Sequence, residues 1–295
     1  MTEIFGIPTQ ALFSQLLIGL INGSFYALLS LGLAVIFGLL NIINFTHGAQ
    51  YMMGAFVAYL LLNKLGLGYW PSLVIVPLIV GATGVAIERL MLSKLYQLDH
   101  LYGLLLTFGL ALIIQGLFRN EYGSSGLPYA MPEQLTGARN LGFMFLPNYR
   151  AWVIVASLVV CLGTWYVIER TKLGAYLRAA TENPQLVQAF GVNVPRMITL
   201  TYGFGVGLAA LAGVMAAPIY QVSPQMGADL IIVVFAVVVI GGMGSIMGSI
   251  VTGFGLGLVE GLTKVFYPEA SNIVIFVIMA IVLLIRPAGL FGTQK

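Results

Sequence analysis

Charged residues are scarce in this 295-residue chain: Asp, Glu, Lys and Arg together make up 8% of it, whereas apolar residues make up 59%. With a mean hydropathy of +0.98, a soluble domain of this size would expose large apolar patches, which soluble proteins avoid. The composition therefore predicts an all-α polytopic membrane protein, since about 20 apolar residues form one helical crossing. It leaves no room for a soluble catalytic domain.

Cysteine and histidine are also scarce, with Cys161 as the one cysteine and His47 and His100 as the two histidines. A single thiol excludes an intramolecular disulfide and a cysteine-rich metal site. His47 has no carboxylate near it and His100 is in a separate loop, which argues against a zinc site. No set of Ser, His and Asp, or of Cys and His, gathers on one side of the membrane. We therefore expect no enzyme activity, no metal and no cofactor.

The sequence has no nucleotide-binding loop. A Walker A loop needs a lysine directly after a glycine, so that backbone amides and the ammonium group hold the phosphates. None of the five lysines follows a glycine, and the glycine-rich run at 241–248 has no basic residue. Any ATP hydrolysis is therefore expected in another subunit, and no stretch predicts a nucleic-acid partner.

The apolar residues fall into nine segments, which predict eight or nine transmembrane helices in a single transmembrane domain over 1–295. The segments lie near 11–43, 49–65, 70–92, 101–118, 151–168, 197–218, 229–249, 250–266 and 272–286. The first would form a helix of roughly 50 Å, longer than the ~30 Å hydrocarbon core, so we expect it to tilt strongly or to break at Asn22-Gly23-Ser24. The stretch 229–266 is too long for one crossing, and its glycines at 241–244 predict a turn or re-entrant corner.

Positive charges set the expected orientation, because Lys and Arg near span ends favour the cytoplasm. The stretch 169–196 contains Arg170, Lys172, Arg178 and Arg196, and the C-terminal tail adds Arg286 and Lys295. We therefore place both stretches in the cytoplasm, together with Glu88 and Arg89 at the end of the third segment. The loop 119–150 is then periplasmic. Residues 1–10 have no Lys or Arg, and we expect no cleavable signal peptide.

Small residues recur at every fourth position near the last long segment. Ser249, Gly253, Gly257 and Gly261 form one narrow stripe, along which a second helix can approach closely. We expect this stripe to pack against another helix of the chain. The alternative is a face that slides or that meets a partner subunit.

Two residues of opposite charge, Glu260 and Lys264, are separated by one helical turn in the same region. Such a spacing lets each side chain offset part of the other's desolvation cost. We expect a structural ion pair there rather than an ion pathway. Asp229 is expected at a helix start, where an acid stabilises free backbone N–H groups.

Five hydrogen-bonding side chains interrupt the apolar pattern between the first two segments. They are Asn41, Asn44, Thr46, His47 and Gln50. One interpretation is structural, with Asn44 or Thr46 as the cap of the next helix and His47 bonded to backbone carbonyls at a bend. The other is a polar lining for a solute, since broken helices near translocation routes expose amide groups to the cargo. These five residues and Asn22 are our candidates for a translocation path.

The polar stretch between the fifth and sixth segments contains signals for a helix start and a helix end. Leu173 to Thr181 is expected to extend the preceding transmembrane helix into the cytoplasm. Asn183 is a good N-cap, Pro184 suits the first helical position and Gly191 suits the residue after the last, which together predict a helix of about seven residues. The apolar residues on one side of it are Leu186, Val187 and Phe190. Because so short a helix is unstable alone, that side must pack on its own membrane domain or insert into a groove on a cytosolic partner.

Four segments of the chain, in the same order, resemble the LivH-type permeases of branched-chain amino acid ABC importers. Ile43 to Gly48 resembles their INFAHG signature, with Thr46 where the family usually has alanine. Arg178 to Pro184, continued by Ala189 to Asn193, resembles their cytoplasmic coupling segment. The two C-terminal blocks that resemble the family are Val239 to Ser245 and Arg286 to Gly292. The likeness extends over almost the whole chain.

This resemblance implies a subunit of a heteromeric importer in the bacterial inner membrane. Its partners would be a second, LivM-like permease, two cytosolic ATPase subunits (LivG-like and LivF-like), a periplasmic amino-acid-binding protein and membrane lipid. The loop 119–150 would belong to the outer docking surface, and the short helix would engage an ATPase. The residues implied for ATPase coupling are Arg178, Ala179, Ala180, Glu182, Asn183, Pro184, Leu186, Val187, Phe190 and Gly191.

The substrates implied by the resemblance are leucine, isoleucine and valine. Related permeases move urea, short amides or other amino acids, so these remain alternatives. A different alternative is a stand-alone secondary carrier or channel that uses the polar stretch at 41–50. It would transport without nucleotide and would not need the short helix at 183–191.

Overall fold

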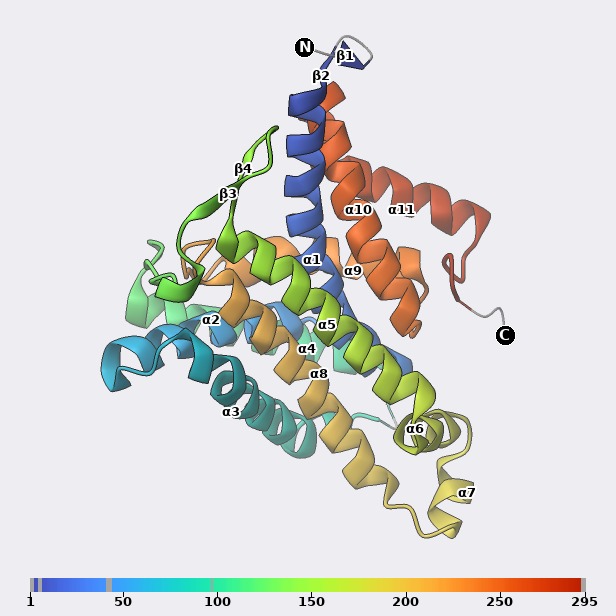
Figure 1. Ribbon diagram of the computed structural model, residues 1–295. Coiled ribbons are helices and arrows are strands. Elements are labelled where there is room, and N and C mark those ends of the chain that lie inside the picture. Colours follow the sequence, from blue (N-terminus) through green and yellow to red (C-terminus); the bar gives the residue numbers. More distant parts are fainter. Residues whose placement is uncertain (1–2, 5–6, 41–43, 97, 293–295) are drawn as a thin grey trace. The chain divides into compact units, whose positions relative to one another are not determined.

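The computed structural model describes residues 3–4, 7–40, 44–96 and 98–292, and in these ranges the chain forms eleven α-helices and two short β-hairpins (Figure 1). Six of the helices are long and apolar enough to cross a membrane. They are α1 (Thr9–Leu40), α3 (Tyr69–Leu90), α4 (His100–Tyr122), α5 (Asn148–Arg170), α8 (Val194–Ala216) and α10 (Ile246–Phe266).

The remaining helices of the described ranges are shorter or less apolar. They are α2 (Thr46–Leu65), α6 (Lys172–Glu182), α7 (Pro184–Ala189), α9 (Met226–Gly241) and α11 (Val274–Ile285). The hairpins pair β1 (Glu3–Ile4) with β2 (Ile7–Pro8), and β3 (Ala138–Asn140) with β4 (Phe145–Pro147), both antiparallel. Each of the nine predicted apolar segments overlaps one of these helices over most of its length. The prediction of an all-α polytopic membrane protein is therefore confirmed.

The predicted break near Asn22 is wrong, because α1 is one continuous helix of 32 residues. Ser24 Oγ donates to the carbonyl of Leu20 at 2.9 Å and so stays within the helical pattern. A Cβ atom at Gly23 would lie 3.0 Å from the backbone of Phe254 in α10. The glycine thus permits close packing between two helices, and it does not mark a turn.

The predicted turn between α9 and α10 is present. Gly242 and Gly244 have φ angles of 102° and 89°, which side chains with a Cβ atom rarely adopt. Ser245 then caps α10, its Oγ accepting from the N–H of Gly248 at 3.1 Å. The N–H of Leu290 donates to the Ile240 carbonyl at 2.8 Å, so the C-terminal block occupies a carbonyl at the end of α9 that the helix itself leaves without a partner.

The chain folds into two compact units, each built from separated stretches. Unit 1 contains the described residues within 1–30, 131–161 and 233–295, and unit 2 contains those within 31–130 and 162–232. The helices α1, α5 and α9 each contribute residues to both units. Most boundaries between the two units therefore fall within helices and not in the loops that connect them.

Unit 1 is held together by the small residues of α10, which lie against the first part of α1 (Figure 1). A Cβ atom at Gly257 would lie 2.4 Å from both the carbonyl oxygen of Gly19 and the Cα of Gly23. Gly253 meets Ala27 and Gly261 meets Gln15 in the same way. Tyr26 donates a hydrogen bond to Glu260 at 2.7 Å, and Glu260 also pairs with Lys264.

Unit 2 is organised around α8, which packs on both α2 and α3 (Figure 1). Gly213 of α8 lies against the backbone of Tyr51, and Gly54 of α2 lies against the backbone of Ala210. Gly203 and Gly207 of α8 face α3, where they approach the backbone of Gly81 and Pro77. Most residues of α8 are buried. Its backbone therefore touches two neighbouring helices at several glycine positions.

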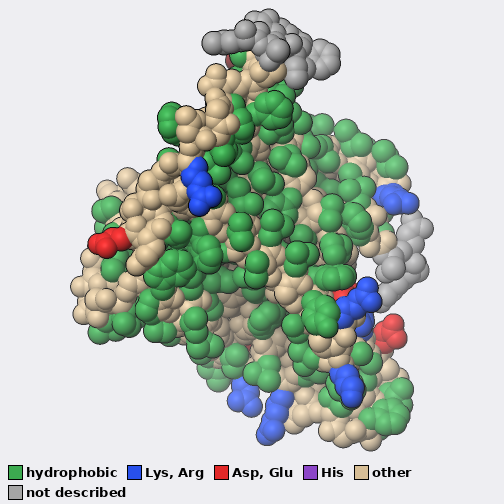
Figure 2. Space-filling model, in the orientation of Figure 1, with side chains coloured by type: hydrophobic (Ala, Val, Ile, Leu, Met, Phe, Trp, Pro, Cys, Tyr) green, Lys and Arg blue, Asp and Glu red, His purple; other side chains and the backbone are tan. Residues whose placement is uncertain are grey.

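The surface of the protein is largely apolar. Hydrophobic side chains cover most of the face seen in Figure 2, and the Lys and Arg side chains on that face are few and scattered near its edges. Helix α4 exposes most of its length. Its exposed large apolar side chains include Leu105, Leu112, Ile113 and Leu117. Such a surface is stable in contact with lipid rather than water.

Replacing Gly257 by alanine is expected to destabilise the protein by about 1–3 kcal/mol, because the new methyl group would force two helix backbones apart. The matched control is Gly255→Ala in the same helix, where a Cβ atom has nothing within 4 Å. That change should be neutral or stabilising by up to ~1 kcal/mol, since alanine favours the helix. Thermal unfolding in detergent measures both. Equal midpoints for the two variants would contradict the packing described here.

Candidate functional site

The stretch between α5 and α8 folds into two short helices, α6 and α7, and not into one extension of α5. Thr171 has extended backbone angles and separates α5 from α6, so the prediction that α5 continues to Thr181 is wrong. Gly174 lies directly on the carbonyl of Ile168, where a Cβ atom would not fit. The Arg178 guanidinium donates to the same carbonyl at 2.8 Å and pairs with Glu169 at 3.4 Å. The last turn of α5 is therefore closed by α6 rather than by further helix.

Helix α7 begins where the sequence predicts and ends at Ala189, one residue earlier than predicted. The Asn183 side chain accepts a hydrogen bond from the N–H of Leu186 at 2.9 Å, and Pro184 occupies the first helical position. Gly191 follows the helix with a φ angle of 84°. A cap of this kind contributes about 1 kcal/mol, which a six-residue helix needs because it has so few hydrogen bonds of its own.

The apolar residues of α7 divide into a buried part and an exposed part. Val187 is buried and forms a small core with Ala180 of α6 and Val194 of α8. Leu186 and Phe190 face outward, with 54% and 80% of their surface exposed. One residue thus fixes α7 to its own unit, while the other two are presented to the surroundings.

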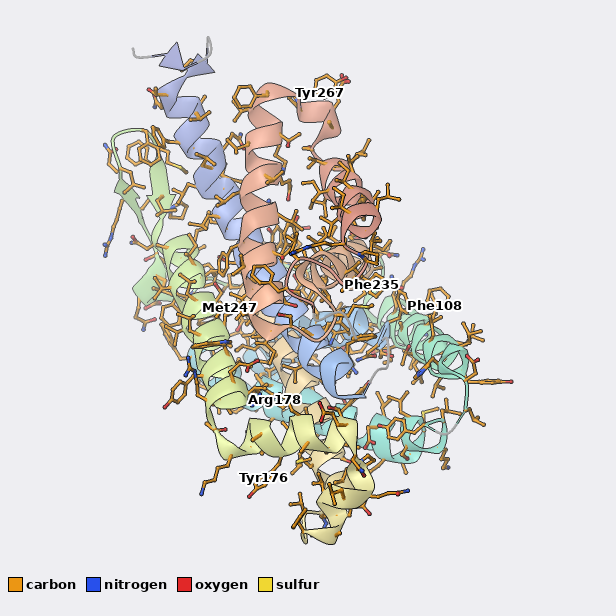
Figure 3. All side chains as sticks on the ribbon, turned by 90° about the vertical axis from the view of Figure 1, so that its right-hand side faces the viewer. Phe108, Tyr176, Arg178, Phe235, Met247 and Tyr267 are labelled. Atoms are coloured by element: carbon orange, nitrogen blue, oxygen red, sulfur yellow. The ribbon has the colours of Figure 1, made fainter. Side chains whose placement is uncertain are left out.

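Helix α6 presents a second exposed apolar surface. Leu173 and Tyr176 are about half exposed, whereas Leu177 and Ala180 are buried. Figure 3 shows Tyr176 and Arg178 pointing to opposite sides of α6. The side that carries Arg178 is fixed to α5, and the side that carries Tyr176 remains open.

A buried carboxyl group joins α3 to the start of α8. Glu88 is 2% exposed and accepts hydrogen bonds from Thr199 Oγ1 and from Tyr96 OH, both at 2.6 Å. Burial and the hydrogen bond to Glu88 raise the pKa of Tyr96, so its hydroxyl keeps its proton at neutral pH. Thr199 lies in the second turn of α8, the helix that follows α7. The sequence placed Glu88 merely at a helix end, and no local signal points to a partner 111 residues away.

The polar stretch before α2 is held against α4. Thr46 Oγ1 donates to the carbonyl of Thr107 at 2.8 Å, and the N–H of Phe45 donates to Thr107 Oγ1 at 3.3 Å. The N-cap position is Phe45, and no side chain caps the helix. The interpretation of Asn44 or Thr46 as the cap of α2 is therefore wrong, because both side chains bond elsewhere.

The remaining polar candidates of this stretch are buried together in unit 2. Asn44 Nδ2 donates to Gln50 Oε1 at 3.2 Å, and the Gln50 side chain faces the buried hydroxyl of Tyr202 in α8. His47 is fully buried beside Gly32 of α1. Asn22 belongs to unit 1, so the structure does not group it with them. Asn41 lies outside the described residues.

A cavity of about 280 Å³ lies on the opposite side of α2, between α2, α4 and the start of α9. Gly48 and Gly227 touch through their backbones and bring the first turns of α2 and α9 together. The wall is almost entirely apolar. Its polar side chain is Gln115, which donates to Gln225 at 2.6 Å. No sequence motif predicted this cavity, because its wall combines three separate stretches.

The long apolar helices and the apolar surface define a polytopic membrane protein. Within the described ranges, no group of three or more His, Cys, Asp or Glu side chains is placed to hold a metal ion. Over residues 15–283 the chain matches the family described as the permease component of branched-chain amino acid transport systems, and it belongs to that family. It is a multi-pass permease subunit of the inner membrane.

Similar proteins match over nearly the full length of this chain. The permease protein BraD of the high-affinity branched-chain amino acid transport system of Pseudomonas aeruginosa is 30% identical over 294 residues, which cover 95% of this chain and 96% of BraD. LivH of Escherichia coli is 28% identical and covers 100% of this chain, with 99% of LivH aligned. LivM of Escherichia coli is 28% identical over 92% of this chain and 68% of LivM. No solved structure matches the chain significantly.

Replacing Tyr96 by phenylalanine is expected to lower the free energy of unfolding by about 1–2 kcal/mol, because Glu88 would lose one of two hydrogen-bond donors while remaining buried. Tyr102→Phe is the control. Because Tyr102 is more than half exposed, removing its hydroxyl group should change the free energy of unfolding little. Thermal unfolding in detergent checks both. If Tyr96→Phe unfolds at the same temperature as the unmodified protein, Glu88 does not depend on this hydrogen bond.

Proposed function

We propose that this chain is the permease subunit of an ATP-driven importer of branched-chain amino acids. The observation that carries the proposal is the match to BraD and LivH, whose names state this transport, over 95% or more of the chain. The whole chain acts as a single permease domain, and the solute path runs through its membrane-embedded part. Asn22, Asn41, Asn44, Thr46, His47 and Gln50 remain our candidates for that path.

The proposal includes four kinds of partner. A second permease completes the membrane part, which the similarity to LivM supports. Two cytosolic ATPase subunits supply the energy, since none of the lysines here follows a glycine and a Walker A loop needs one. A periplasmic binding protein delivers the substrate to the outer surface, which includes the loop 119–150 and its hairpin β3–β4.

The exposed side of α7 is the proposed contact with an ATPase subunit. Phe190, directly after the last residue of α7, presents a large apolar side chain that is 80% exposed, and Leu186 within α7 is 54% exposed. Aromatic side chains in desolvated pockets supply much of the binding energy of protein interfaces. Because Val187 anchors α7 to α6 and α8, a push on Phe190 reaches α8 through packed side chains. This gives the stretch 169–196 its role as the cytoplasmic coupling loop.

Phe190→Asp is expected to leave the protein inserted in the membrane but to abolish ATP-dependent uptake, because a carboxylate enters an apolar groove only at a large desolvation cost. The control is Phe190→Leu, which keeps an apolar side chain and should retain most of the uptake. The measurement is uptake of radioactive leucine into vesicles that contain the complex purified with its neighbouring gene products.

Three results would count against the proposal. The first is normal uptake by Phe190→Asp, which would remove α7 from energy coupling. The second is uptake by vesicles that contain this chain alone without ATP, which would make it a stand-alone carrier or channel. The third is an intact ATP-driven complex that carries urea or a short amide but not leucine. This result would support the importer but contradict the proposed substrate.

A further inference from the structure

The cavity between α2, α4 and α9 has no role in the coupling mechanism, yet it is too large to be a packing defect. Its volume of about 280 Å³ equals roughly nine times the ~30 Å³ that one water molecule occupies in the liquid. Small-molecule sites typically measure about 300–1,000 Å³, so this cavity suits a molecule at the small end of that range.

The cavity wall is chemically uniform. Phe45, Met52, Phe108, Leu112 and Ile231 supply most of the apolar side chains. Glycine and alanine residues on α2, α4 and α9 keep the space between them free. They are Gly48, Ala49, Ala111, Gly227 and Ala228. Figure 3 shows Phe108 on α4, one of the three helices that form this wall.

We propose that this cavity receives the branched apolar side chain of the transported amino acid and so contributes to the choice among substrates. The inference rests on the proposed function, which names the substrate class but does not place it. The cavity wall has no charged side chain, so the ammonium and carboxylate groups of the substrate are bound outside it.

The structure favours a free amino acid over a lipid chain as the occupant. The cavity is small, at about 280 Å³, whereas an acyl chain needs a long groove. A polar edge is also present at Gln115 and Gln225. Amide side chains at the edge of an apolar site fix the orientation of a ligand that has one polar and one apolar end.

The two faces of α2 have separate roles in this arrangement. Residues 45, 48, 49 and 52 recur at helical spacing and form the cavity wall. His47, Gln50 and Gly54 lie on the other side, toward α1 and α8. Because that side is packed by buried polar groups and glycine contacts, α2 is held in place and the cavity keeps its shape without a ligand. A preformed site loses less free energy on binding.

The test compares leucine with valine, which differ by one methylene group. Ala111→Leu narrows the cavity and should lower the ratio of kcat/KM for leucine to that for valine by about tenfold, since one methylene in a tight apolar pocket changes discrimination by 10- to 200-fold. Leu112→Ala widens it and should leave the ratio unchanged or raise it. Ile113→Phe adds bulk to the far side of α4, where Ile113 is 59% exposed, and should change nothing.

The measurement is uptake by vesicles that contain the whole complex and the same binding protein in every case. The binding protein's own preference then cancels between variants, and the ratio does not depend on how much of each variant folds. If the unmodified complex takes up neither amino acid, the proposed function fails. If it takes up both and Ala111→Leu keeps the normal ratio, only the present inference is overturned.

Labelling supplies a second measurement that a merely structural cavity would not affect. The native Cys161 is fully buried, so Ala111→Cys introduces the one accessible thiol among the described residues. Leucine added during ATP turnover should slow its reaction with a maleimide several-fold, and lysine should not. A reaction rate that leucine leaves unchanged would overturn the inference, with lipid or the second permease as the occupant of the cavity.

Discussion

The contact of α8 with α2 and α3 is the constraint on which unit 2 depends. Inside a membrane the hydrophobic effect does not drive helices together, so association relies on close packing and hydrogen bonds. Glycines at 54, 81, 203 and 213 let three backbones touch. Once α8 is fixed, the start of α2 has a defined position near one end of α8, and α7 has one near the other end. A movement of α7 can therefore be transmitted along α8 to the start of α2.

Polar contacts add specificity to this packing. Thr107 holds the start of α2, and Glu88 holds the start of α8. A buried carboxyl group is costly unless it is hydrogen-bonded, so an arrangement that separated Glu88 from Thr199 would be penalised. Each polar contact thus secures one end of a helix whose middle is fixed by glycines. Both contacts matter for the proposed function, because the start of α2 lines the cavity and the start of α8 follows α7.

Much of the fold follows from local patterns. Nine apolar segments gave nine helices, and the glycines after α9 gave a turn, because both depend on residues close in sequence. Asn183, Pro184 and Gly191 predicted α7 for the same reason. Three predictions failed where a distant contact overrides the local preference. Thr46 looked like a helix cap but donates to the carbonyl of Thr107 in α4. Gly23 looked like a break but meets α10, and the residues after α5 looked helical but turn back on Ile168.

The sequence by itself determined the class of protein, the number of apolar helices, the limits of α7 and the family, since hydropathy, capping and motifs are properties of short stretches. Tertiary structure alone decided that Val187 is buried while Phe190 is exposed, that Glu88 meets Thr199 and that α2, α4 and α9 enclose a cavity. The physical reason is that burial and cavities arise from side chains far apart in the chain. Helical periodicity predicts which residues share a face, but not what that face will meet.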